Sequence, residues 1–323
     1  MSFKDLRCQD RAVFLLKSII KSKRIPAALL FWGEDGVGKK LAAVNFAKTL
    51  NCEEESDDAC GRCASCVKID TGNHPDVRIV PKETDSESIK IEEIRDLQKC
   101  ASLKNFEGKK KVFIIDEAHN LTAEAANAFL KILEEPPSTT LFILVSSKHE
   151  LLFSTIISRC QKVRFAAMDK KKLENILEND YAKSPEISHY LAYFYQGRLG
   201  ASLRMKDKEV LEGKNNIIER FMNEKNQMSD DFSQNKQELK ESLEVLLAWL
   251  RDIYLIKTGM PHSELINLDS VNQLLRVMPR LSFYDLDVAI NSLSEASLYL
   301  EQNINPKLIL ANLRYKLWTK LHK

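Results

Sequence analysis

The sequence predicts an α/β domain built on a parallel sheet with helices on both faces, followed by an all-helical C-terminal region. Three short apolar runs end in glycine or polar residues, as buried strands do, and segments with helical spacing separate them. Buried strands that alternate with helices form three-layer parallel domains. In the last third of the chain, leucine-rich segments with helical spacing indicate helices.

The elements of the first domain follow in chain order from these patterns. Strands are expected over Ala27–Trp32, Val112–Ile115 and Leu141–Val145. Helices are expected over residues 11–20, 41–50 and 123–133. A glycine-rich turn after the first run favours a strand there, and Pro136-Pro137 ends the third helix because proline cannot continue it.

The chain is expected to divide near residues 165 and 206, since its length suggests two or three domains. Residues 1–165 form the α/β domain, and 166–206 form a small helical unit. A polar, charged stretch opens the third part, 207–323, in which apolar helix faces begin at about Leu239 and Leu308.

Composition and charge narrow the function. Of 323 residues, 44% are hydrophobic and 29% are charged, and the formal net charge is +2. This composition excludes a disordered chain. Because the net charge is near zero, any contact with nucleic acid must use local patches of basic residues rather than the overall charge of the molecule. We expect a cytoplasmic protein with reduced thiols, because neither a signal peptide nor an apolar run of about 18–20 residues is present.

The first motif is a phosphate-binding loop. The segment Gly33–Lys40 matches G-x-x-x-x-G-K between an expected strand and helix. Gly33, Gly36 and Gly38 would let backbone N–H groups converge on phosphate oxygens, and Lys39 would reach the β- and γ-phosphates. Lys40 stands where a Ser or Thr hydroxyl normally binds Mg²⁺, and a protonated lysine cannot coordinate a metal. ATP or ADP binding is therefore expected, whereas Lys40 argues against Mg²⁺.

The second motif is a pair of carboxylates at the end of a strand. Asp116 and Glu117 follow the run Val112–Ile115. In the Walker B pattern such an Asp orients Mg²⁺ and such a Glu positions a water molecule. The pair is informative because it follows a phosphate-binding loop in the same α/β domain.

The third motif is a group of four cysteines with the spacing C-x7-C-x2-C-x2-C. Its members are Cys52, Cys60, Cys63 and Cys66. Four thiolates at these spacings can surround one Zn²⁺ tetrahedrally, and a site with four protein ligands leaves no open position for a substrate. We expect a structural zinc module over residues 52–66.

Three other polar segments are less specific. Arg159 lies in Ser158-Arg159-Cys160 beyond the third strand and could stabilise charge on a transferring phosphoryl group, although most arginines of this kind form surface ion pairs. The segment His74-Pro75-Asp76 is interpreted as a turn. The run Lys109-Lys110-Lys111 is interpreted as a solvated loop end, with DNA contact as the weaker alternative.

Together these motifs resemble the bacterial DNA polymerase III clamp loader, an AAA+ family. The cysteine cluster, Gly72–Asp76, Asp116–His119, Asn127–Pro137 and Ser158–Cys160 are similar to its gamma/tau and delta-prime subunits. The likeness is specific over residues 1–205 and thinner beyond, where Asn303–Pro306 is similar to the end of the family's helical collar.

The resemblance implies a hetero-oligomer of related subunits that uses ATP to open a sliding clamp and place it on primed DNA during replication. It makes 1–165 the AAA+ domain, 166–206 a lid and 207–323 a collar for oligomerisation. It also makes Arg159 an arginine finger that acts on a neighbour's ATP, and places Ser146 or Ser147 at the sensor-1 position near the γ-phosphate. The partners would be gamma/tau and delta subunits, the clamp and primed DNA, and no membrane.

Two departures bear on the kind of subunit. Lys40 replaces the metal-binding hydroxyl, and Gly200 stands where motor subunits carry a sensor-2 arginine. These departures favour the delta-prime type, which completes a neighbour's site and is not an enzyme by itself, although it is part of the polymerase holoenzyme. Two alternatives stay open: an ATPase motor of gamma/tau type, favoured by Lys39, Asp116 and Glu117, and a zinc-dependent DNA-binding protein.

Overall fold

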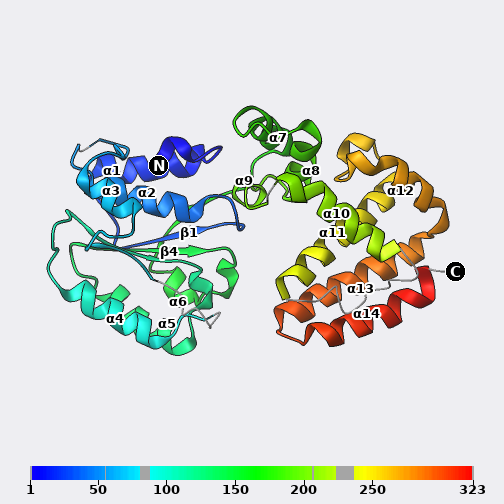
Figure 1. The fold of residues 1–323 in the computed structure, drawn as a ribbon. Helices are drawn as coiled ribbons and strands as arrows, with labels where there is room; N and C mark the ends of the chain where they lie inside the picture. Colours follow the sequence, from blue (N-terminus) through cyan, green and yellow to red (C-terminus); the bar gives the residue numbers. More distant parts are fainter. Residues whose placement is uncertain (1, 55, 81–87, 206, 223–235, 322–323) are drawn as a thin grey trace. The chain divides into compact units, whose positions relative to one another are not determined.

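The computed structural model describes residues 2–54, 56–80, 88–205, 207–222 and 236–321 (Figure 1). Contacts divide the chain into two compact units. The first contains residues 1–168 with 198–201, and the second contains residues 169–197 with 202–323. The helical stretch 169–197 thus groups with the C-terminal region, while the separation of a lid (166–206) from a collar (207–323) stays a prediction.

The first unit is built on a five-stranded parallel sheet in the order β2-β3-β4-β1-β5. Its strands are β1 (Ala28–Trp32), β2 (Val77–Val80), β3 (Lys111–Ile115), β4 (Thr140–Ser146) and β5 (Gln161–Arg164). The three predicted strands are confirmed as β1, β3 and β4, which form the fully paired centre. The two edge strands escaped the prediction because polar residues interrupt their apolar pattern.

Helices cover both faces of this sheet (Figure 1). One face carries α1 (Asp10–Ser22), α2 (Lys39–Asn51) and α3 (Ala64–Asp70), and the other carries α4 (Ile91–Ser102), α5 (Ala123–Glu134) and α6 (Ser154–Ile157). Along β1, Leu29 and Phe31 join the core under α2, whereas Leu30 joins the core under α5. This alternation of side chains explains why the run is apolar throughout.

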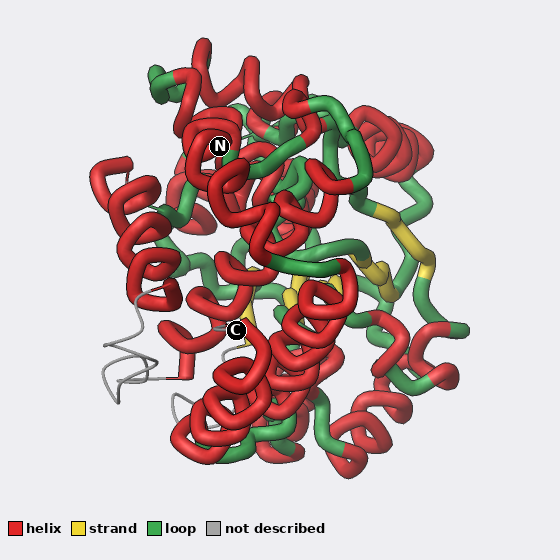
Figure 2. Tube along the Cα trace, turned by 90° about the vertical axis from the view of Figure 1, so that its right-hand side faces the viewer, coloured by secondary structure: helices red, strands yellow, loops and turns green. Residues whose placement is uncertain are grey.

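Among the described residues of the second unit, all regular elements are helices, which loops connect (Figure 2). Its helices are α7 (Lys170–Asn179), α8 (Pro185–Phe194), α10 (Asp207–Met222), α11 (Lys236–Lys257), α12 (Val271–Val277), α13 (Phe283–Glu301) and α14 (Pro306–Leu321). Its core gathers around the fully buried Trp249 of α11, which shares one apolar cluster with Leu246 and with Leu293 of α13. The predicted helical region is thereby confirmed.

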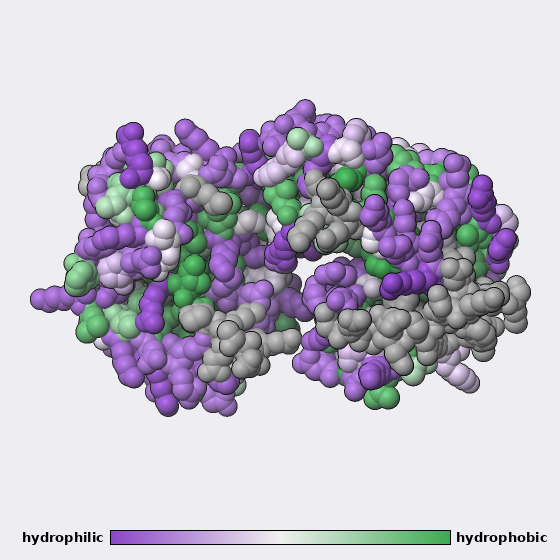
Figure 3. Space-filling view, in the orientation of Figure 1, coloured by the Kyte–Doolittle hydropathy of each residue, from purple (hydrophilic) through white to green (hydrophobic). Residues whose placement is uncertain are grey.

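Shorter segments complete the two units. They are α9 (Leu199–Ser202) and the 3₁₀ turns η1 (Phe3–Asp5), η2 (Ala118–Asn120), η3 (His149–Leu151), η6 (His262–Glu264), η7 (Leu268–Ser270) and η8 (Met278–Arg280). The surface visible in Figure 3 is mainly hydrophilic, with small hydrophobic groups between. Across the described ranges, none of the helices combines the length and apolarity that crossing a membrane would require.

Candidate nucleotide site, cysteine cluster and Arg159

The phosphate-binding loop leads from the end of β1 into the first turn of α2. Gly33, Gly36 and Gly38 have φ values of +141°, +79° and +94°, which L side chains rarely adopt. A Cβ atom on Gly33 would also lie 2.0 Å from the carbonyl oxygen of Phe165. Glycine is thus required by the backbone path itself, as the motif predicts.

Lys39 lies within this loop and is 6% exposed. Its Nζ donates hydrogen bonds to the carbonyl oxygens of Gly33, at 2.7 Å, and Glu34, at 2.5 Å. A lysine held in this way has its charge at the centre of the loop, where phosphate oxygens would be bound. The role of Lys39 at the phosphates stays a prediction.

The segment around α9 packs directly on the loop. The backbone N–H of Gly200 donates to the carbonyl oxygen of Gly36 at 2.8 Å. A Cβ on Gly200 would lie 2.8 Å from the same oxygen, and a Cβ on Gly36 would lie 2.6 Å from the nitrogen of Ala201. The backbones approach so closely that any side chain at position 200, including a sensor-2 arginine, would force them apart.

Lys40 pairs with the first carboxylate of the Walker B motif. Its Nζ lies 2.9 Å from Oδ2 of Asp116, and the two side chains are 55% and 25% exposed. The other carboxylate oxygen, Oδ1, accepts the backbone N–H of Glu117 at 3.0 Å. The phosphate loop and the end of β3 are therefore joined by an ion pair between the two residues that a metal ion would otherwise bridge.

The neighbouring predicted residues lie at the ends of the central strands. Glu117 adopts a left-handed conformation, with φ of +46°, and its Oε2 accepts the Nδ2 of Asn120 at 3.3 Å. Ser146, at the end of β4, is fully buried, and its Oγ lies 3.2 Å from Nδ1 of His119. The ends of β3 and β4, where Walker B and sensor-1 residues are predicted, are thus in contact through His119, which the sequence does not single out.

Arg159 follows α6 and is bound by residues outside the phosphate loop. It donates to the carbonyl oxygen of Thr155 at 3.0 Å and to Oε1 of Glu134 at 3.0 Å. The side chains of Arg159 and Glu134 are 37% and 54% exposed, so their ion pair is screened by solvent and contributes about 0–1 kcal/mol. A pair this weak leaves the guanidinium available to a stronger anion.

The four predicted cysteines form one cluster. Cys52 directly follows α2 and Cys63 directly precedes α3, and the sulfur atoms of the cluster all lie within 4.8 Å of one another. The backbone N–H groups of Cys63 and Cys66 donate to the sulfurs of Cys60 and Cys63, each at 3.4 Å. In a tetrahedral zinc site with bonds of about 2.3 Å, sulfurs are about 3.8 Å apart. The cluster therefore fits the geometry that zinc requires.

The environment affects these thiols unequally. Burial opposes the ionisation of Cys63, but backbone N–H groups outweigh it and lower the pKa of this thiol to about 7. At Cys66 burial prevails, and the pKa is raised. Burial also raises the pKa of Cys52. Burial therefore disfavours the thiolate form of Cys52 and Cys66, and ligation of a metal cation would offset this cost.

Asp76, interpreted as part of a turn, is a buried anchor for the loop before β3. Its carboxylate accepts the backbone N–H groups of Phe106, Glu107 and Gly108 at 2.8–3.0 Å. Burial opposes ionisation, yet these three bonds outweigh it and lower the pKa of Asp76.

The interpretation of Lys111 as solvated was wrong. It is 5% exposed, and its Nζ donates to carbonyl oxygens at the end of α4.

Replacing Asp76 by asparagine is expected to lower the free energy of unfolding at pH 7 by about 1–3 kcal/mol, because an amide cannot accept three N–H bonds as a carboxylate does. Since the folded pKa is lowered, this contribution is complete above the ordinary pKa of an aspartate and is lost as the pH falls through the folded value. Urea unfolding of both proteins at pH 7 and at successively lower pH measures the difference. Asp96→Asn, at an exposed side chain, is the control, and a difference independent of pH would contradict this account.

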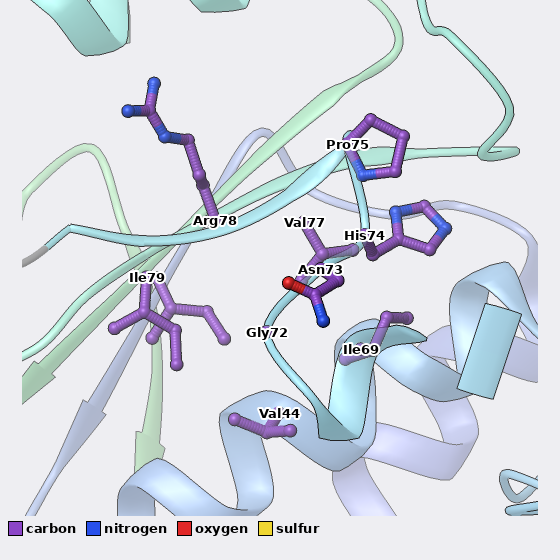
Figure 4. Close-up of a pocket in the computed structure, with 10 residues that line it drawn as sticks. Val44, Ile69, Gly72, Asn73, His74, Pro75, Val77, Arg78 and Ile79 are labelled. Atoms are coloured by element: carbon purple, nitrogen blue, oxygen red, sulfur yellow. The ribbon is translucent and has the colours of Figure 1, made fainter. Parts of the chain in front are cut away.

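A pocket of about 460 Å³ lies beside the edge strand β2 (Figure 4). Val44 of α2, Ile69 of α3, and Val77 and Ile79 of β2 provide most of its apolar lining. The predicted nucleotide-binding residues and the cysteines are not among its lining residues. The pocket is therefore separate from both sites.

A glycine loop between β1 and α2, carboxylates after β3 and the strand order β2-β3-β4-β1-β5 define a P-loop domain of the AAA+ class. The family model described as "DNA polymerase III, delta subunit" matches residues 8–169, and its C-terminal companion matches residues 211–317. The chain therefore belongs to this DNA polymerase III family.

Individual relatives agree with this assignment. DNA polymerase III subunit delta' of Bacillus subtilis is 31% identical over 94% of this chain and 95% of its own length. DNA polymerase III subunit tau of Escherichia coli is 35% identical over 66% of this chain, but the match spans only 33% of tau. A solved structure of a gamma subunit-related protein from Thermotoga maritima has a TM-score of 0.50 at 17% identity and covers 96% of this chain and all of its own, which shows a shared fold.

Proposed function

We propose that this chain acts as the delta-prime type of subunit in a DNA polymerase III clamp loader. In this role it binds gamma/tau and delta subunits and assists the ATP-dependent loading of a sliding clamp on primed DNA. The relationship to the Bacillus subtilis delta' subunit, which extends over 94% of this chain and 95% of that subunit, supports this assignment.

The ion pair between Lys40 and Asp116 is the observation that carries the proposal. With its Walker B aspartate bound to a lysine, the pocket lacks the charge arrangement that stabilises a transferring phosphoryl group. Arg159, in contrast, is partly exposed and weakly paired. We infer that the chain hydrolyses little ATP and contributes Arg159 as an arginine finger to the ATP site of a neighbouring subunit.

Steady-state ATP turnover tests this division of roles. The isolated chain is expected to turn over little ATP, and Asp116→Ala is expected to leave that low rate unchanged. Mixing the chain with gamma/tau and delta subunits of the same loader is expected to raise turnover. Robust turnover by the isolated chain that Asp116→Ala abolishes would instead support the gamma/tau motor alternative, which the 35% identity to tau keeps in view.

We also propose that the four-cysteine cluster holds one structural Zn²⁺. The burial of Cys52 and Cys66, the short N–H···S contacts and the mutual distances of the sulfurs support this ligand set. A closed set of four thiolates supplies no open position for substrate, so the metal would stabilise the fold rather than take part in chemistry.

The collar role of residues 207–323 is part of the proposal, and exposed leucines on α13 and α14 support it. Leu298 and Leu308 are 57% and 66% exposed. Leu308→Glu is expected to weaken assembly with gamma/tau and delta about tenfold or more, because a charge would be buried in an apolar contact. Sedimentation or size-exclusion chromatography of mixed subunits measures this, with Gln302→Glu as the control. Unchanged assembly for both variants would remove this face from the interface.

A further inference from the structure

The cation next to the Asp116 carboxylate is the ammonium group of Lys40, a side chain of this protein. Magnesium in a P-loop site needs a hydroxyl from the residue after the loop lysine and a carboxylate from the Walker B strand. Residue 40 is a lysine, whose ammonium has three donors and no acceptor. Both oxygens of Asp116 are engaged, Oδ2 by Lys40 at 2.9 Å and Oδ1 by the N–H of Glu117 at 3.0 Å. The residues present do not fit magnesium.

We infer that the Lys40 ammonium replaces the magnesium ion as a resident counter-cation, so that nucleotide binding by this chain is independent of Mg²⁺. Lys40 lies in the first turn of α2, directly after the buried Lys39, and the backbone N–H of Glu117 bonds to the other carboxylate oxygen of Asp116. The ion pair between Lys40 and Asp116 links the phosphate loop to the end of β3 without a metal ion.

As a consequence, the net charge of this pocket differs from that of a P-loop site that contains a metal ion. A metal-containing site combines a loop lysine, a doubly charged cation and one aspartate, whereas this pocket combines Lys39, Lys40 and Asp116. It therefore carries one positive charge fewer opposite a polyphosphate. Because the γ-phosphate adds negative charge, we expect the pocket to favour ATP over ADP less than a metal-containing site does.

This inference deepens the proposed function and rests on it for the role of the pocket. Its test needs only the isolated chain, whereas the arginine finger is tested in the assembled loader, so either can fail without the other. Lys40→Thr supplies the missing hydroxyl and frees Asp116. Lys40→Met removes the charge without supplying a ligand and is the matched control. The side chain of Lys40 is 55% exposed, so both variants should fold, which circular dichroism checks.

Binding of a fluorescent ATP analogue is titrated for the three proteins in Mg²⁺ and in EDTA. The wild type is expected to bind with the same affinity in both, within about twofold, and an absence of binding in both would overturn the inference. Lys40→Thr is expected to bind about tenfold more tightly in Mg²⁺ than in EDTA, and Lys40→Met is expected to show no such difference. Tighter binding of the wild type in Mg²⁺ would overturn the inference, as would a Lys40→Thr variant that gains no dependence on Mg²⁺.

Discussion

Replacing Arg159 by alanine is expected to lower ATP turnover of the assembled loader sharply while leaving this chain folded and assembled. An arginine finger offsets charge that develops on the transferring phosphoryl group, and its loss reduces the rate at the site it serves by about 10³-fold or more. The fold should tolerate the change, because the side chain is partly exposed and its pairing with Glu134 is solvent-screened. Steady-state turnover of the reconstituted complex measures the effect.

Arg164→Ala provides the matched control. Arg164 lies five residues further along the chain, on β5, and is exposed, with its guanidinium 5.3 Å from the ring centre of Trp32. This variant should lose a similar amount of surface charge without affecting turnover. If Arg159→Ala assembles normally and turns over ATP at the wild-type rate, Arg159 has no part in the reaction. If both variants lower turnover equally, the effect comes from surface charge rather than from a finger.

Loss of the metal is expected to have the second large effect. We predict one zinc per chain, measured by elemental analysis of protein purified without chelator. Cys66→Ser should lose the zinc and several kcal/mol of stability, because a structural zinc site contributes its binding free energy to folding. Cys66 is fully buried, so the substitution also places a hydroxyl among sulfurs.

A cysteine outside the cluster provides the control that distinguishes loss of metal binding from a general effect of replacing cysteine by serine. Cys100 lies outside the cluster and contacts Arg78, so Cys100→Ser should retain the zinc and most of the stability. Treatment with a strong chelator should lower the melting temperature of the wild type and leave that of Cys66→Ser unchanged. Elemental analysis that finds no zinc in the wild type would discard the assignment of the cluster.

The central strands were predictable because both of their faces are buried. The runs that became β1, β3 and β4 are apolar without interruption, whereas Arg78 in β2 and Lys162 in β5 interrupt the edge strands. The glycine loop and the cysteine cluster were also predictable, because their chemistry requires residue types at fixed spacing along the chain.

Contacts between distant segments could not be predicted in the same way. Lys40 reaches Asp116 because β1 and β3 flank β4, so their ends are separated by the width of one strand, and only the strand order reveals this. Asp76 escaped attention because its partners are backbone N–H groups of a loop, whose direction leaves no periodic signal in the sequence. His119 was quoted only as part of a motif, without its contact to Ser146.

Helix α2 has the phosphate loop at its first residue and the first cysteine of the cluster directly after its last. Its 13 residues span about 20 Å, and the fully buried Lys48 near its end bonds to Asp70 of α3 at 2.7 Å. In so short a helix, we expect fraying at one terminus to weaken the backbone hydrogen bonds near the other terminus. Amide hydrogen exchange at Ala42 and the residues after it, whose N–H groups are the first to be bonded within α2, should therefore accelerate when metal is stripped from the distal end, a long-range readout that requires no catalytic assay.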